Sequence, residues 1–197
     1  LLLDTLKNFS DQPLSFIIDQ SNFGIEISSD YGKYKLVGQN PDDFPKSPEL
    51  ENATSFQVKG EIIANAIDKT LFATGNDELR PVMSGVFCQF SPDKLTFVAT
   101  DAHKLVRYSR LDSNATESAD FILPKKPLNL LKQNVGNDSD VSLKYNNTTV
   151  RFDFGNIELT SRLIDGKYPN YDAVIPQENP NVLTVDRISF LNSIKRV

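Results

Sequence analysis

The chain contains one histidine, His103, which follows Asp101 by two residues and Thr100 by three. An Asp-x-His pair can supply a general acid and base, and Thr100 could act as the nucleophile, so the three side chains are candidates for a hydrolytic site. Nucleophilic catalysis also needs donors for the oxyanion, and no nucleophile elbow or glycine-rich turn accompanies them. The alternative is a structural turn in which Asp101 bonds the backbone and His103 is half exposed.

The residues around this corner predict how it is held. Apolar side chains recur at every second position over residues 87–90 and 95–99, and turn-forming residues 91–94 lie between them. This alternation predicts a β-hairpin with one buried face. It resumes at Leu105, directly after the polar corner. We therefore expect the candidate residues to lie in a short turn between two strands.

An internal repeat organises the rest of the chain. A helical pattern over residues 1–9 precedes three expected strands and then Phe44-Pro45, and the same order from Pro127 ends at Tyr168-Pro169. The expected strands are 14–18, 23–28 and 31–37 in the first copy, and 141–145, 149–154 and 157–161 in the second. After each aromatic-proline pair another strand, 56–58 or 183–185, leads into a helix, 59–73 or 186–197. The two prolines are 124 positions apart, so the repeating unit is a domain.

The repeat predicts the domain organisation. Residues 1–53 form the C-terminal half of a first domain, residues 54–177 a complete second domain, and residues 178–197 the first strand and helix of a third. Each copy is an α+β unit with antiparallel sheets and two helices on one face. The absence of an initiator methionine also indicates a fragment.

Composition narrows the class of protein. The single cysteine, Cys88, excludes an intrachain disulfide and a cysteine-rich zinc site, and we expect no metal and no cofactor. No run approaches eighteen apolar residues and no signal peptide opens the chain, so we expect a cytoplasmic protein that does not enter the membrane.

Charge is distributed unevenly. The whole chain carries 21 basic and 26 acidic residues, a net charge of −5. The four helical segments 1–8, 59–74, 125–133 and 186–196 hold nine basic and four acidic residues, a net of +5, so the remainder carries −10. This separation suits helices that face a phosphate backbone, although solvated helix faces are commonly rich in lysine.

Two separate motifs carry a family resemblance. Gly85 to Phe87 with Leu95 to Leu105, and later Leu163 to Tyr171 (LIDGKYPNY), resemble the middle domain of the bacterial DNA polymerase III beta subunit, the sliding clamp. The resemblance implies tandem clamp domains, with sheets outside and two helices per domain inside, closed head to tail into a homodimeric ring. Such a ring is a non-catalytic processivity factor that encircles double-stranded DNA without reading its sequence.

The resemblance also implies two sets of site residues. The DNA-facing residues are Arg80, Lys69, Lys125 and Lys126. Pro81 and Val82 stand where many members have aromatic residues, which argues against a stacking contact there. A pocket for short peptides of the polymerase catalytic subunit, the clamp loader and repair polymerases consists of Met83, Thr100, Ala102, His103, Lys104, Leu105, Pro169 and Val174.

Two departures fall in the peptide motifs. Ala102 replaces a glycine usual in this turn, so a left-handed backbone there would be strained, and Ala173 replaces a common basic residue. The plainer interpretation of the pocket is that its apolar members fill the core beneath the corner.

Two other functions compete with the clamp. A hydrolase would use the Asp101/His103 corner, whereas a transcription factor is disfavoured by the negative net charge and the lack of a recognition-helix pattern. We also expect that this fragment cannot close a ring by itself.

Overall fold

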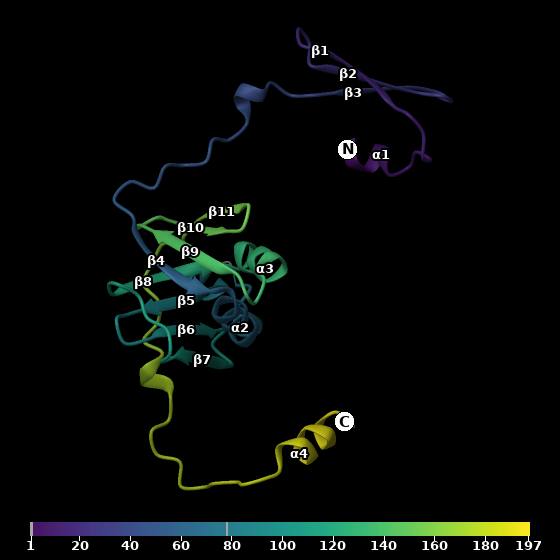
Figure 1. Ribbon diagram of the computed structural model, residues 1–197. Coiled ribbons are helices and arrows are strands. Elements are labelled where there is room, and N and C mark those ends of the chain that lie inside the picture. The colour runs from purple at the N-terminus through teal and green to yellow at the C-terminus, as the bar shows by residue number, and fades with distance from the viewer. Residues whose placement is uncertain (1, 78) are drawn as a thin grey trace. The chain divides into compact units, whose positions relative to one another are not determined.

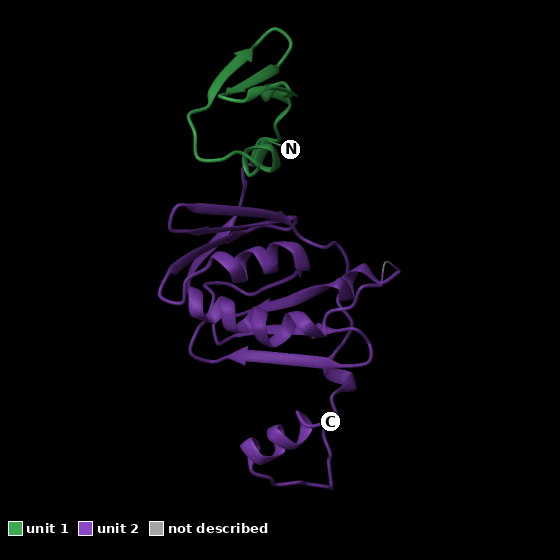
Figure 2. Cartoon of the chain, turned by 90° about the vertical axis from the view of Figure 1, so that its right-hand side faces the viewer, with its two compact units in different colours: residues 1–48 green, residues 49–197 purple. Residues whose placement is uncertain are grey.

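The computed structural model describes residues 2–77 and 79–197, and Figure 1 labels its helices and strands. The chain divides into two compact units, residues 1–48 and 49–197, which are coloured separately in Figure 2.

Unit 1 is a small antiparallel sheet with one short helix. Its strands follow in the order β1-β2-β3, with β1 at one edge. Ile27 on the central strand is fully buried, and the rings of Phe9 and Tyr34 meet edge to face at 4.9 Å. The elements are α1 (Leu2–Leu6), β1 (Ser15–Asp19), β2 (Gly24–Ser29), β3 (Gly32–Val37) and the 3-10 turn η1 (Pro41–Asp43).

Unit 2 contains two four-stranded antiparallel sheets. The first sheet has the order β11-β10-β9-β4, with strands β4 (Thr54–Lys59), β9 (Asp140–Tyr145), β10 (Thr149–Phe154) and β11 (Ile157–Arg162). The second has the order β7-β6-β5-β8, with strands β5 (Gly85–Phe90), β6 (Leu95–Thr100), β7 (Leu105–Arg110) and β8 (Ala119–Pro124). The remaining elements are the helices α2 (Gly60–Thr70), α3 (Lys125–Asn134) and α4 (Arg187–Ile194) and the 3-10 turns η2 (Leu71–Ala73), η3 (Pro81–Ser84) and η4 (Asp172–Val174).

Helices α2 and α3 lie beside one another on the same side of the sheets (Figure 1). Residues at helical spacing turn one face of α2 inward, and Ile63 and Ile67 on that face are almost completely buried. Leu128 and Leu131 do the same for α3. These side chains join the residues of both sheets that face the helices in one core.

The segment 163–175, here called the strap, crosses the other face of the second sheet. It starts at β8, where the N–H of Ile164 donates to the carbonyl of Ile122 at 3.0 Å. Tyr168 then stacks on Phe87 with ring centroids 4.6 Å apart. A smaller apolar cluster forms beneath the strap, so the second sheet is covered on both faces.

The α+β class and the antiparallel sheets with helices on one side are confirmed. The expected hairpin is present, with Phe90 paired to Leu95 across the turn. The single buried face expected for it is wrong, because all six residues of β6 are buried between the main core and the cluster beneath the strap. The strand expected at 183–185 is wrong, since those residues are in an extended but unpaired segment. A strand needs a neighbouring strand to pair with. The corresponding strand of unit 2, β4, pairs with β9.

Among the described residues, 2–77 and 79–197, no helix is both long and apolar enough to cross a lipid bilayer.

Candidate functional site

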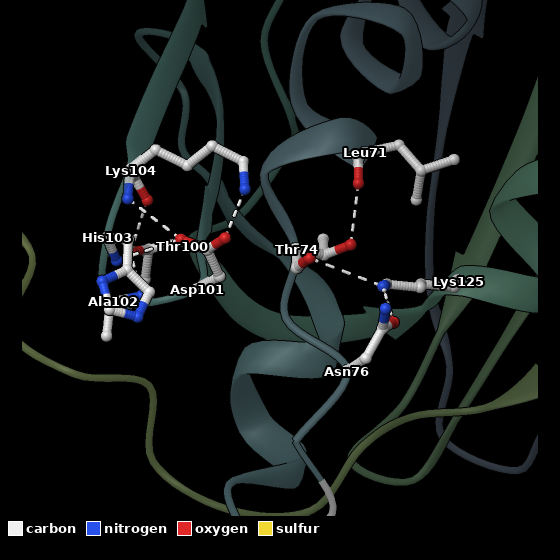
Figure 3. A network of polar contacts seen from close by, with 9 residues as sticks. All are labelled: Leu71, Thr74, Asn76, Thr100, Asp101, Ala102, His103, Lys104 and Lys125. Atoms are coloured by element: carbon white, nitrogen blue, oxygen red, sulfur yellow. Dashed lines mark hydrogen bonds and ion pairs between the residues drawn. The ribbon is translucent and has the colours of Figure 1, made fainter.

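The corner between β6 and β7 is a turn held by its own side chains (Figure 3). The hydroxyl of Thr100 donates to the carbonyl of Lys104 at 2.8 Å and accepts from the N–H of Ala102 at 3.1 Å. Oδ1 of Asp101 accepts from the N–H groups of His103 and Lys104 at 3.0 and 2.9 Å. Five consecutive residues are thereby fixed in one conformation by short-range hydrogen bonds.

Asp101 is the anchor of this turn. Its second carboxylate oxygen binds the ammonium group of Lys104. This bond and the two backbone N–H groups lower the pKa of Asp101 far below its ordinary value, so it is a carboxylate at neutral pH.

The geometry does not support the hydrolase alternative. Asp101 bonds the backbone N–H of His103, whereas an acid/base pair needs a hydrogen bond to the imidazole ring. The hydroxyl of Thr100 is likewise committed to the turn. Within residues 2–77 and 79–197, no group of three or more His, Cys, Asp or Glu side chains could hold a metal ion.

Ala102 adopts a left-handed backbone conformation with φ of 74°. A β-carbon makes this region unfavourable, so the turn expected for glycine is retained at the cost of local strain.

The loop 74–76 connects the corner with the first turn of α3. The ammonium group of Lys125 donates to the carbonyl of Thr74 at 3.5 Å and to the side-chain oxygen of Asn76 (Figure 3). Between them, the N–H of Gly75 donates to the carbonyl of Met83 at 2.7 Å. A β-carbon built on Gly75 would lie 3.7 Å from Asp101, so this backbone packs directly against the corner.

An open hollow of about 640 Å³ lies where these parts meet. The last turn of α2, the first turns of α3, the loop 74–77 and the β6–β7 corner all border it. Its charged and polar lining residues are Asp68, Thr74, Asn76, Asp77, Asp101, His103, Lys104, Lys125, Asn129 and Lys132. The structure thus brings His103 and Lys104, expected at the peptide pocket, to the same hollow as Lys125, expected to face DNA.

Each carboxylate at the hollow has a basic partner. Asp68 lies 2.7 Å from Lys132, Asp77 lies 2.8 Å from Arg80, and Asp101 binds Lys104. The first two pairs also lower the pKa of their carboxyl groups, chiefly through the side-chain hydrogen bond. Lys125 differs from these basic residues because, within residues 2–77 and 79–197, its hydrogen bonds go to the neutral oxygens of Thr74 and Asn76.

The other expected DNA-facing residues occupy different positions. Lys126 and Lys69 are exposed, on the first turn of α3 and the last turn of α2. Arg80 is also exposed and is held by Asp77. Both helices lie on the same side of the sheets of unit 2 (Figure 1).

The expected peptide-pocket residues divide into two groups. Leu105 packs into the cluster beneath the strap with Val98, Ile122 and Tyr168, so it is partly a core residue. Met83 and Pro169 are half-buried, and Thr100 is buried. The exposed members are Ala102, His103, Lys104 and Val174.

Tyr168 and Tyr171 belong to this region although sequence reasoning did not select them. Both side chains extend from the strap and are almost completely buried, and the hydroxyl of Tyr171 donates to the side-chain oxygen of Gln89. The sequence feature that could have identified them is the pair of tyrosines three residues apart around Pro169. Large aromatic side chains in a loop are commonly buried and fix the loop to the core.

Comparison with known proteins shows which protein family the chain resembles in sequence. Residues 57–170 match the model of the central domain of the DNA polymerase III beta subunit. The beta sliding clamp of Synechococcus elongatus is 30% identical over 201 aligned residues, which cover all of this chain and 52% of that protein. The beta sliding clamp of Bacillus subtilis is 30% identical over 90% of this chain and 47% of its own length.

Solved structures agree in fold. The sliding clamp of Bacillus subtilis superposes with a TM-score of 0.85 and 27% identity, over 99% of this chain and 52% of that one. The clamp of Bartonella birtlesii, solved bound to griselimycin, gives a TM-score of 0.82 and 28% identity, over 100% of this chain and 54% of that one. The chain thus spans about half the length of the relatives that it matches.

Proposed function

Because the chain belongs to the DNA polymerase III beta subunit family, we propose that it is part of a sliding clamp, a processivity factor that encircles double-stranded DNA. One observation carries this proposal: the whole chain, beyond any single motif, aligns with sliding clamps in sequence and in fold. In this proposal residues 1–53, 54–177 and 178–197 belong to three successive domains, and the full-length protein is a homodimer in the cytoplasm.

The proposed role requires no catalysis and no cofactor. A ring holds DNA by enclosing it, so its contacts need only be weak and directed at phosphates. Lys69, Lys125 and Lys126 on the helices, with Arg80 nearby, are suited to this because lysine presents a flexible point charge. The charged partners of Lys132 and Arg80 keep the surface only moderately basic, which favours mobility along the duplex.

We propose that the second activity is tethering of the polymerase catalytic subunit, the clamp loader and repair polymerases through short peptides. The surface for it combines exposed polar groups of His103 and Lys104 with the apolar side chains of Met83, Leu105 and Val174, which is the usual composition of a peptide site. Ligand binding by the Bartonella birtlesii clamp supports the presence of such a site in this family.

Duplex binding tests the first activity. Fluorescence anisotropy with two duplexes of equal length and unrelated sequence should give equal affinities that fall steeply with salt. A strong preference for one sequence, or binding that salt does not weaken, would contradict the proposal.

Griselimycin provides a probe for the second site. We expect the exposed-residue variant His103→Ala and the variant Leu105→Asp to weaken griselimycin binding, measured by calorimetry. Leu111→Asp is the matched control, because Leu111 is an exposed leucine on a loop. Thermal melting of each variant separates lost binding from lost folding, since Leu105 is partly a core residue. If both variants are folded and bind griselimycin as tightly as wild type does, the assignment of His103 and Leu105 to the peptide site is wrong.

A further inference from the structure

One loop of unit 2 connects the hollow with the surface expected to bind peptides. It comprises residues 74–77 and 79–84 and is here called the α2–β5 loop. Its first residues border the hollow, whereas Met83 near its end belongs to the expected peptide surface. The neighbouring Val82 packs into the cluster beneath the strap, and a β-carbon built on Gly166 of the strap would lie 2.8 Å from its Cγ1. The end of the loop therefore lies directly beside the strap.

Hydrogen bonds within the α2–β5 loop close it on itself. The N–H of Gly75 donates to the carbonyl of Met83 at 2.7 Å, and the N–H of Met83 donates to the carbonyl of Arg80 at 3.0 Å. Between these bonds, the carboxylate of Asp77 accepts from the N–H of Leu79 at 2.9 Å and from Nε of Arg80 at 2.8 Å. Because the two ends of the loop are bonded to each other, a displacement of Gly75 also displaces Met83.

Lys125 fixes this loop from outside it. Lys125 begins α3 directly after β8, whose last residue Pro124 pairs with Gly85 at the end of the loop. Its side chain reaches back to the beginning of the loop, where the ammonium group donates to the carbonyl of Thr74 and the side-chain oxygen of Asn76 (Figure 3). Among the side chains of residues 2–77 and 79–197, it is the one that hydrogen-bonds the loop from a distant part of the sequence.

The chemistry of the ammonium group suits this task. A hydrogen bond from a charged donor is stronger than one between two neutral groups, so one lysine can restrain a loop. Lys132, which borders the same hollow, bonds Asp68 on α2 instead. An ammonium group has three N–H donors, so the two bonds of Lys125 to the loop leave a third for a phosphate oxygen. Restraint of the loop is therefore compatible with the DNA contact proposed above.

We propose that Lys125 is a positioning residue for the peptide surface. It holds the α2–β5 loop in place, and the loop holds Met83 beside the β6–β7 corner, since Gly75 packs against Asp101. A surface whose parts are already in place binds more tightly, because less conformational entropy is lost on binding. The effect on peptides rests on the proposed tethering function, whereas the restraint of the loop does not.

Hydrogen exchange of the Gly75 amide measures the restraint of the loop. This amide is buried and bonded to Met83, so it exchanges when the loop opens. Lys125→Met keeps an unbranched side chain of similar length without a donor, and it should raise the exchange rate of Gly75 about tenfold. A loss of overall stability alone does not change the rate of an amide that exchanges through local opening.

Two further variants show whether Lys125 acts through the loop. Lys132→Met is the matched control, because it removes the same charge from the same hollow but not from the loop, and it should leave the Gly75 rate unchanged. Asn76→Ala should raise that rate, and Lys125→Met/Asn76→Ala should exchange no faster than Lys125→Met, since both changes remove one bond. A Gly75 rate that Lys125→Met leaves at the wild-type value, or that Lys132→Met raises equally, would overturn the proposal.

Griselimycin binding, measured by calorimetry, tests the effect on the peptide surface. Lys125→Met should weaken it about three- to tenfold, whereas Lys132→Met should not. Lys125→Arg, which restores a charged donor, should recover most of the loss. A Lys125→Met variant that binds griselimycin like wild type would overturn the positioning role. A wild-type chain that does not bind griselimycin would contradict the tethering function and the effect on peptides with it, and the exchange rates would still decide whether Lys125 restrains the loop.

Discussion

The ammonium group of Lys132 on α3 lies 2.7 Å from the carboxylate of Asp68 on α2 and joins the two helices. Lys59, which precedes α2, is similarly paired with Asp140 at 2.6 Å. Counting charges along the helical segments therefore overstates the free positive charge that they present. Among the lysines expected to face DNA, Lys126 and Lys69 are exposed, and Lys69 lies 3.9 Å from Asp68, which Lys132 also contacts. Lys125 is half-buried.

The exposed helix lysines should control the salt dependence of duplex binding. Removing one phosphate contact lowers the slope of log affinity against log salt by about 0.9. Lys69→Gln and Lys126→Gln should each produce this reduction and weaken binding equally for unrelated sequences. Anisotropy titrations over a range of salt concentrations measure both effects.

Lys94→Gln is the control for these variants. Lys94 is an exposed lysine on the β5–β6 turn, so the substitution removes the same charge at a distance from the helices. A slope that falls as much for Lys94→Gln as for the helix variants would show that binding follows net charge alone.

Ala102→Gly should stabilise the protein. The left-handed region costs a non-glycine residue roughly 1–2 kcal/mol, whereas glycine loses roughly 0.5–1 kcal/mol more conformational entropy on folding. The expected net gain is about 0.5–1 kcal/mol, or an increase in Tm of about 1–3 °C. Ala99→Gly, in the buried strand β6, should instead lower the Tm, and a decrease for Ala102→Gly would show that the corner is not strained.

Patterns in the sequence predicted the elements better than the site. Alternation and the repeat located β5, β6 and α2 because the residues that face the main core recur with a regular period in each of them. Alternation did not show that β6 is buried on both faces, because the second face is covered by the strap, which is distant in sequence. They could not show that 183–185 would lack a partner strand, since pairing depends on residues distant in sequence. The sequence separation of Asp101 and Lys125 likewise did not indicate that both residues border one hollow. Their proximity depends on how the loop 74–76 packs against the corner.

The corner should lose stability in acid through Asp101. Hydrogen bonds from Lys104 and from two backbone N–H groups lower the pKa of Asp101 in the folded state. Its contribution is therefore fully present above the ordinary pKa of about 4 and is lost as the pH falls below that value. Asp101→Asn keeps one acceptor oxygen but cannot ionise, so the stability difference between wild type and variant should be constant from about pH 6 to pH 5 and should shrink as the pH falls below about 4.

Chemical denaturation at several pH values measures this difference. Asp93→Asn is the control, because Asp93 is an exposed aspartate on the β5–β6 turn. A difference between wild type and Asp101→Asn that is independent of pH would show that the carboxylate charge does not stabilise the turn.

Removing the hydroxyl group should change the stability of the protein differently at the two tyrosines of the strap, Tyr168 and Tyr171. The hydroxyl of Tyr171 donates to Gln89, whereas the hydroxyl of Tyr168 is buried without a hydrogen-bond partner among the described residues, and burial raises the pKa of Tyr168 to about 12. Tyr171→Phe should cost about 1 kcal/mol, while Tyr168→Phe should be neutral or stabilising, because it removes an unsatisfied polar group and keeps the ring that stacks on Phe87. Urea denaturation of both variants measures the contrast, and a loss for Tyr168→Phe as large as that for Tyr171→Phe would mean that its hydroxyl is bonded in solution.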